Sequence, residues 1–126
     1  MTPYLLVFAG GGLGACARHA INVASARAFG TTLPWGTFTV NVAGSLFMGL
    51  LIGWLSMRAQ GGNDLRLFAA TGFLGGFTTF SAFSLDVAIL WERGLAMQAF
   101  AYAAASVVIS LMALAAGLWI ARTGVA

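Results

Sequence analysis

The sequence predicts an all-α membrane protein, a single domain of residues 1–126 with four transmembrane helices. The chain is 60% hydrophobic and only 7% charged, whereas a soluble domain carries about 25% charged residues because its surface faces water. Asp, Glu, Lys and Arg are also absent from four long segments, residues 1–17, 28–57, 67–85 and 94–121. Because a helix that crosses a bilayer needs about 20 mostly apolar residues, each segment is long enough to supply most of one span.

Aromatic residues indicate where the first two spans begin and end. The first span is expected over residues 3–25, with Tyr4 at its start, and the second over residues 34–57. Trp35 and Trp54 bracket the second span and are 19 residues apart. That separation is roughly 28 Å along a helix, close to the hydrocarbon thickness of about 30 Å. Tyr and Trp are enriched at membrane interfaces, so their positions support these limits.

The third span is expected over residues 67–91 and the fourth over residues 95–121. Paired glycines followed by hydroxyl residues occupy the middle of the third span, in the segment 72–84, and these residue types form helices poorly. A break there leaves backbone carbonyls free in the bilayer, which is tolerated only where protein, a cavity or an ion satisfies them. The sequence therefore predicts a break in the third span; a continuous helix packed through its glycines is the alternative.

Two ladders of neutral polar side chains follow the second and the fourth span. They are Thr37, Asn41 and Ser45 in the second span, and Tyr102, Ser106 and Ser110 in the fourth. Residues spaced by four share one face of a helix, and polar side chains are costly inside a membrane. Hydrogen bonding between helices is one interpretation of the ladders, and an ion pathway is the other.

Arginine placement gives no preferred orientation in the membrane. With four spans, Arg58, Arg66 and Arg122 lie on the side of the termini, and Arg18, Arg27 and Arg93 lie on the other side. The positive-inside rule assigns no orientation to a count of three against three. Such a chain can insert both ways, and two copies could then pair as an antiparallel homodimer. A single, weakly biased orientation is the alternative.

The motifs of common enzymes are absent. The chain has one histidine, His19, and lacks the metalloprotease, hydrolase and P-loop motifs, so no catalytic residue is expected. Residues 10–15 match the glycine pattern of a dinucleotide site only formally, because no strand and crossover accompany them. The scattered arginines form no basic patch, so no nucleic acid partner is expected.

Three motifs together resemble the Fluc/CrcB family of fluoride channels. They are Gly11-x-x-Gly14-Ala15-x-x-Arg18, Asn41-x-x-Gly44-Ser45-x-x-x-Gly49, and Gly75-Gly76-Phe77-Thr78-Thr79-Phe80-Ser81-x-Phe83-Ser84. The resemblance covers all four spans. It implies a dual-topology, antiparallel homodimer in the bacterial inner membrane, surrounded by lipid, with two pores that export fluoride passively and so lower cytoplasmic fluoride.

The resemblance also implies roles for particular residues. Asn41 would donate a hydrogen bond to fluoride, Phe80 and Phe83 would line each pore across the two subunits, and Tyr102, Ser106 and Ser110 would form a hydroxyl track. A structural sodium ion at the dimer centre would be bound by the main-chain carbonyls of Gly75 and Thr78. Arg18 would lie near the pore mouth.

Two other classes of protein have a similar size and composition. A small four-span, dual-topology multidrug exporter needs a glutamate within its first span, and no acidic residue occurs there. A membrane assembly subunit without transport activity is the second alternative. The intramembrane Asn41 and the predicted break argue against that class.

Overall fold

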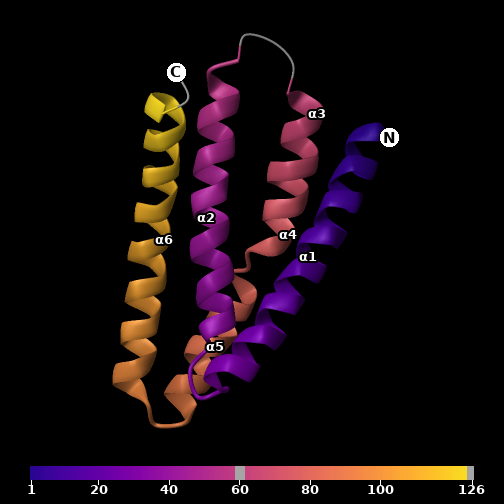
Figure 1. The fold of residues 1–126 in the computed structure, drawn as a ribbon. Coiled ribbons are helices and arrows are strands. Elements are labelled where there is room, and N and C mark those ends of the chain that lie inside the picture. Colours follow the sequence, from indigo (N-terminus) through magenta and orange to yellow (C-terminus); the bar gives the residue numbers. More distant parts are fainter. Residues whose placement is uncertain (59–61, 125–126) are drawn as a thin grey trace.

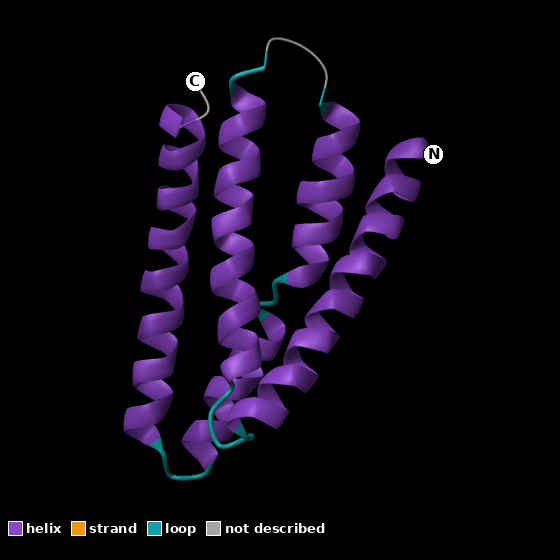
Figure 2. Ribbon diagram, viewed as in Figure 1, coloured by secondary structure: helices purple, strands orange, loops and turns teal. Residues whose placement is uncertain are grey.

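Four long helical segments lie side by side in the computed structural model, which describes residues 1–58 and 62–124 (Figures 1 and 2). The elements in chain order are α1 (Thr2–Phe29), α2 (Trp35–Ser56), α3 (Asn63–Leu65), the π-helix η1 (Arg66–Leu74), α4 (Gly75–Phe77), α5 (Ser81–Glu92) and α6 (Ala96–Gly124). The start of α1 and the end of α6 lie at one end of the bundle, and α1 is inclined to α2 and α6 (Figure 1).

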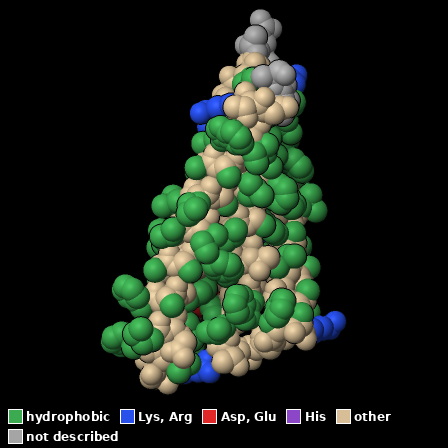
Figure 3. All heavy atoms as spheres, turned by 60° about the vertical axis from the view of Figure 1, so that its left-hand side comes forward, with side chains coloured by type: hydrophobic (Ala, Val, Ile, Leu, Met, Phe, Trp, Pro, Cys, Tyr) green, Lys and Arg blue, Asp and Glu red, His purple; other side chains and the backbone are tan. Residues whose placement is uncertain are grey.

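Each of the four segments is long and apolar enough to cross a membrane, when α3 to α5 are taken together as Asn63–Glu92. Their mean hydropathies range from 1.2 to 2.1. The face drawn in Figure 3 is covered by hydrophobic side chains over its middle, with arginine side chains toward the two ends. The prediction of an all-α, four-span fold is therefore confirmed, and the chain is a multi-pass membrane protein.

Helix α1 and helix α6 extend beyond the bounds expected from the sequence. Helix α1 continues to Phe29, four residues past the expected end, and stops where Gly30 adopts a positive φ of 79°. Helix α6 continues to Gly124, three residues past its expected end. The expected bounds followed the thickness of a membrane, whereas a helix ends where a residue that departs from helical geometry interrupts it.

Residues 78–80 lie between α4 and α5 and belong to no helix; this segment is called the break below. Thr78 has an extended backbone, with φ of −87° and ψ of 161°. Figure 2 shows the break about half-way along the bundle. The preceding elements α3, η1 and α4 follow one another directly, so one helical run ends at Phe77 and another begins at Ser81.

Glycines allow the helices to approach closely. A Cβ atom added at Gly49 would contact the carbonyl oxygen of Leu114, and one added at Gly117 would contact that of Leu46. Helix α2 therefore packs on α6 through backbone contact. Helix α1 packs in the same way on η1 and α4, because a Cβ atom at Gly14 would contact the carbonyl oxygen of Phe73.

Arg18 lies within a helix rather than near its end. It precedes the last residue of α1 by eleven positions, which is roughly 16 Å along a helix. The remaining arginines divide three against two between the ends of the bundle, because Arg58, Arg66 and Arg122 flank the end with the termini and Arg27 and Arg93 flank the other. The even count of three against three expected from the sequence therefore becomes three against two, because Arg18 lies inside α1.

Candidate functional site

A pocket of about 410 Å³ lies against the break. Its walls come from α2, from the third segment and from α6. The lining residues are Asn41, Ser45, Gly75, Thr78, Thr79, Phe80, Phe83, Ser106, Val107, Ser110 and Leu111. None of these side chains carries a charge. The pocket therefore unites seven of the nine site residues predicted from the sequence, while Tyr102 and Arg18 lie outside its lining.

Asn41 binds the break with both ends of its amide. Its Nδ2 donates to the carbonyl oxygen of Thr79 at 2.9 Å, and its Oδ1 accepts from the Thr79 backbone N–H at 2.7 Å. An asparagine amide has two N–H donors, so one donor remains after the bond to Thr79. Asn41 thus fixes the extended backbone of the break to α2 and keeps a donor at the pocket.

The hydroxyl groups of Ser106 and Ser110 have no partner among the described residues, although both oxygen atoms are buried. Ser106 as a whole is only 5% exposed. A buried hydroxyl without a hydrogen bond is costly, and such groups in native proteins usually meet a water or an ion. Both hydroxyls line the pocket, so the pocket contains hydrogen-bonding capacity that the protein itself leaves unused.

Three aromatic rings form a continuous row beside these hydroxyls. The ring centroids of Phe80 and Phe83 are 5.5 Å apart, and those of Phe83 and Tyr102 are 5.4 Å apart. Phe83 is 9% exposed, whereas Phe80 is 75% exposed on the single chain. Phe80 therefore has most of its ring free to contact lipid or another chain.

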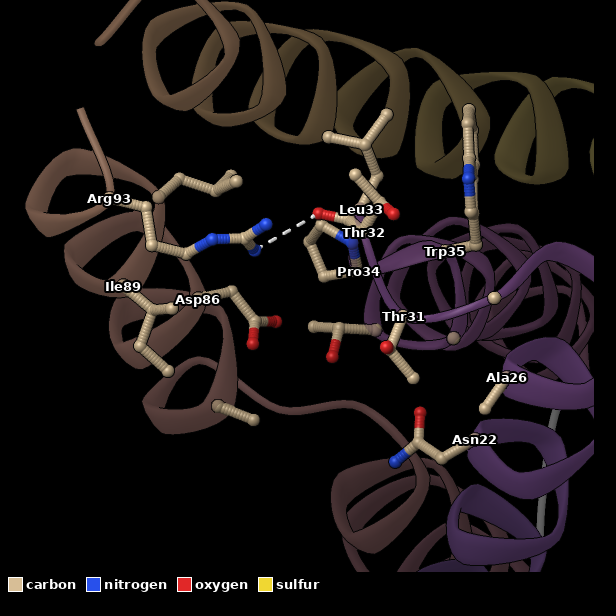
Figure 4. A pocket seen from close by; sticks show the side chains of 15 residues that line it. Asn22, Ala26, Thr31, Thr32, Leu33, Pro34, Trp35, Asp86, Ile89 and Arg93 are labelled. Carbon is tan, nitrogen blue, oxygen red and sulfur yellow. Dashed lines mark hydrogen bonds between the residues drawn. The ribbon is translucent and has the colours of Figure 1, made fainter. Parts of the chain in front are cut away.

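Tyr102 connects this row to a second pocket of about 360 Å³, drawn in Figure 4. The Tyr102 hydroxyl donates to Oδ2 of Asp86 at 3.1 Å, and Asp86 lines the second pocket. Arg93 also lines it and donates through Nη1 to the carbonyl oxygen of Thr32 at 3.4 Å, the dashed line of Figure 4. The second pocket lies where α1 and α5 end and α2 begins, so it contains charged groups that the first pocket lacks.

Backbone carbonyls around the break divide into satisfied and free groups. The oxygen of Leu74 accepts from both the N–H and the hydroxyl of Thr78, at 3.0 and 2.9 Å. The oxygen of Gly76 accepts from Nε of Arg18 at 3.1 Å. Over residues 1–58 and 62–124, no donor reaches the carbonyl oxygens of Gly75 or Thr78.

Free carbonyl oxygens suit a hard cation such as sodium. Within the part of the chain that the structure describes, no group of three His, Cys, Asp or Glu side chains could hold a metal ion. A sodium ion at the break would then have neutral oxygens as ligands, from the backbone or from hydroxyl and amide side chains. The free carbonyls of Gly75 and Thr78 are consistent with that requirement.

Two contacts of the site were not predicted from the sequence. Thr79 is the partner of Asn41, and its hydroxyl also accepts from the N–H of Ala82 at 3.1 Å, at the start of α5. Asp86 is the partner of Tyr102. The run of hydroxyl residues in the third span marked Thr79 as unusual, but no local signal indicates which distant residue each side chain binds.

Comparison with known proteins identifies the family. Residues 5–118 match the family described as "CrcB-like protein, Camphor Resistance (CrcB)", which is most of the chain. The chain belongs to the CrcB family. The resemblance seen in the three sequence motifs is thereby confirmed.

Relatives of this CrcB chain match it over nearly its whole length. A protein of Nitrobacter hamburgensis named "Fluoride-specific ion channel FluC 2" is 57% identical over 94% of this chain and 96% of its own. Proteins of Mesorhizobium japonicum and of a Chelativorans species, each named "Fluoride-specific ion channel FluC", are both 56% identical over 98% of either chain.

Proposed function

We propose that this CrcB protein is a subunit of a fluoride-selective ion channel, rather than an enzyme. Two copies in opposite orientations would form a homodimer with two pores, which let fluoride leave the cell passively across the bacterial inner membrane. The names of the relatives support the choice of ion. The chemistry of the pocket at the break supports the mode of transport.

The observation that carries this proposal is the set of unused hydrogen-bond donors in an uncharged pocket. Fluoride is small and strongly hydrated, so a pore must replace its water with donors. The hydroxyls of Ser106 and Ser110 and the second N–H of Asn41 are available for that purpose. Because no fixed positive charge lines the pocket, an ion is bound weakly enough to move on, as conduction requires.

Phe80 and Phe83 would guide the anion along the same wall. The edge of a phenyl ring is electropositive, so rings turned edge-on attract an anion without holding it as an ionised side chain would. The 75% exposure of Phe80 on the single chain is consistent with a ring that meets the partner subunit. Each pore would then combine phenylalanines of both subunits.

Asp86 and Tyr102 would form the approach to this pathway from the second pocket. The Tyr102 hydroxyl donates to Oδ2 of Asp86 and so joins the two residues at this approach. The ring of Tyr102 also packs on Phe83. To act in a hydroxyl track, Tyr102 would have to turn its single O–H from Asp86 to the ion.

A sodium ion would be held by the carbonyls of Gly75 and Thr78 from both subunits. When bound, it would supply positive charge at the dimer centre and satisfy carbonyls that are free on the single chain. The proposal is supported by the lack of a donor to either oxygen among the described residues. The backbone of this chain contributes the oxygens, and Asn41 holds the adjoining Thr79 in place.

Efflux from liposomes tests the channel. Purified protein is reconstituted into liposomes loaded with fluoride or with chloride, and release is followed with ion-selective electrodes. Fast fluoride release with little chloride release is expected. A folded, dimeric preparation that releases no fluoride would refute the proposed function.

A further inference from the structure

Arg18 lies eleven residues before the end of α1, and its guanidinium is bonded to the end of α4. We propose that Arg18 is a positioning residue, which holds the backbone at the break through the carbonyl of Gly76. The effect of Arg18 on fluoride transport rests on the proposed channel function. The structural part of the inference, that Arg18 on α1 holds the break in place, is tested separately.

The close contact of α1 with the third segment brings Arg18 to this position. Gly10, Gly14 and Arg18 are spaced by four and lie on one face of α1. A Cβ atom at Gly10 would contact the carbonyl oxygen of Phe68, and one at Gly14 that of Phe73. The two backbones therefore touch at two successive turns. One turn further along, Arg18 reaches the carbonyl oxygen of Gly76.

The position of Gly76 explains why a cation is favourable there. Helical structure runs from Asn63 to Phe77 and then stops, so its last carbonyls lack partners within the helix. The carboxyl end of a helix carries a partial negative charge, which a nearby cation stabilises. Arg18 is half-buried and forms no ion pair among the described residues. The helix end is thus the counter-charge that the structure provides for the guanidinium.

Arg18 acts on the pathway indirectly. It does not line the 410 Å³ pocket, so it does not meet an ion there. Its bond fixes the peptide group of Gly76, which lies next to Gly75 and two residues before Thr78. The orientation of those two free carbonyls therefore depends on a side chain from a different helix. Loss of Arg18 would loosen the break without removing any group that faces the pocket.

The test compares Arg18→Met with Arg27→Met and Arg18→Lys. Methionine keeps an apolar stem of similar length and removes the donor and the charge. Arg27 is an exposed arginine near the end of the same helix, so Arg27→Met controls for the loss of one positive charge. Hydrogen–deuterium exchange of the amides of residues 78–82 reports on the break, exchange in α6 is the internal reference, and fluoride efflux reports on transport.

Arg18→Met is expected to speed exchange at residues 78–82 by about tenfold or more while α6 stays unchanged. Fluoride efflux by Arg18→Met is expected to fall by at least about tenfold. Arg27→Met is expected to match the wild type in both measurements, and Arg18→Lys is expected to recover part of the loss. Unchanged exchange at residues 78–82 would overturn the inference, even if efflux fell, because Arg18 would then act on the ion directly. Equal acceleration in α6 would also overturn it.

If Arg18→Met does not assemble, Arg18→Lys decides the question. Lysine keeps the charge but replaces the planar guanidinium that bonds Gly76 with an ammonium on a flexible stem. Gly76 would be held less firmly, so exchange at the break is expected to be faster than in the wild type, and exchange at the wild-type rate would overturn the requirement for the Nε–H bond. If the wild-type protein showed no fluoride efflux, the channel function would be refuted, but the structural role of Arg18 would not. The exchange comparison would still determine whether Arg18 holds the break.

Discussion

Asn41 connects α2 to the break with both ends of one amide. The family resemblance implied that Asn41 donates to fluoride, and the structure shows another contact, the pairing with the Thr79 backbone. The two roles would use different atoms. One N–H and the oxygen hold Thr79, and the proposed contact with fluoride would use the other N–H. Asparagine is suited to this position because its amide is neutral and offers both donors and an acceptor.

Asn41→Asp is expected to lower fluoride efflux by about a hundredfold. Aspartate has the same shape, but its ionised form cannot donate to the Thr79 carbonyl and places a negative charge in the pocket. Electrode recordings from liposomes measure the loss. Asn63→Asp at the exposed start of α3 is the matched control and should conduct as the wild type does. Similar efflux from Asn41→Asp and the wild type would contradict the assigned role.

Ser106→Ala separates conduction from stability. The Ser106 hydroxyl has no partner among the described residues, so its removal breaks no hydrogen bond to them and takes away a buried polar group. The melting temperature of the purified protein should stay the same or rise, while fluoride efflux falls several-fold, by about fivefold. A variant that keeps normal efflux would show that this hydroxyl does not serve the ion.

Seven of the residues that line the pocket were predicted as site residues, whereas their partners were not predicted. Asn41, Ser106 and Ser110 stand out because polar side chains are unusual in apolar spans. The bonds to Thr79 and from Arg18 to Gly76 connect residues 38 and 58 positions apart. Such pairs depend on how the helices pack, which periodicity within one helix does not specify.

Helix α1 acts as a support for the third segment, and its glycines make this possible. At Gly14 an added Cβ atom would contact the carbonyl oxygen of Phe73, whereas at Gly12 nothing lies within 4 Å. The two glycines are two residues apart in one helix and have opposite surroundings. Alanine at both positions changes the helix propensity in the same way, but only at Gly14 does it meet another helix. The comparison therefore separates the effect of packing from the effect of helix propensity.

Gly14→Ala is expected to lower the melting temperature and the fluoride efflux, because the backbones of α1 and η1 must separate to admit the methyl group. Gly12→Ala should be neutral or slightly stabilising, since alanine favours a helix over glycine by about 1 kcal/mol. Thermal unfolding of both variants in detergent measures the difference. Equal stability of the two variants would contradict the close contact of α1 with the third segment.

Composition predicted the four spans. The two glycines followed by hydroxyl residues predicted where the third span departs from a regular helix. The lengths of α1 and α6 were not predicted, because membrane thickness limits the apolar core of a helix and not its ends. The π-helical geometry of Arg66–Leu74 was also not predicted. Apart from Thr71 and Gly72 its residues are ordinary for an α-helix, and Gly72 lies against the backbone of α1.

The whole channel would require two chains in opposite orientations. The five arginines at the ends of the bundle divide three against two, which leaves only a weak bias toward one orientation. A cysteine at Thr123 in a Cys16→Ser background reports the side on which the carboxyl end lies. An impermeant thiol reagent applied to intact spheroplasts should label about half of the molecules. Labelling of nearly all or almost none would rule out dual topology.

Sodium would join the two subunits through carbonyls that neither subunit satisfies alone. Replacement of sodium by N-methylglucamine on both sides of the membrane is expected to lower fluoride efflux and to weaken the dimer. Efflux and size-exclusion profiles in the two buffers, at equal ionic strength, measure these effects. Return of sodium should restore both. Identical behaviour in the two buffers would contradict a sodium ion at Gly75 and Thr78.

The inclination of α1 has a consequence for the choice of lipid. With 28 residues, α1 is roughly 42 Å long, and an overlong helix fits a bilayer by tilting. Lipids with longer acyl chains would bring α1 more upright, and lipids with shorter chains would tilt it further. Because Arg18 on this helix bonds Gly76, a change in acyl-chain length would be transmitted to the break. Transport by this protein should therefore depend on the membrane that surrounds it.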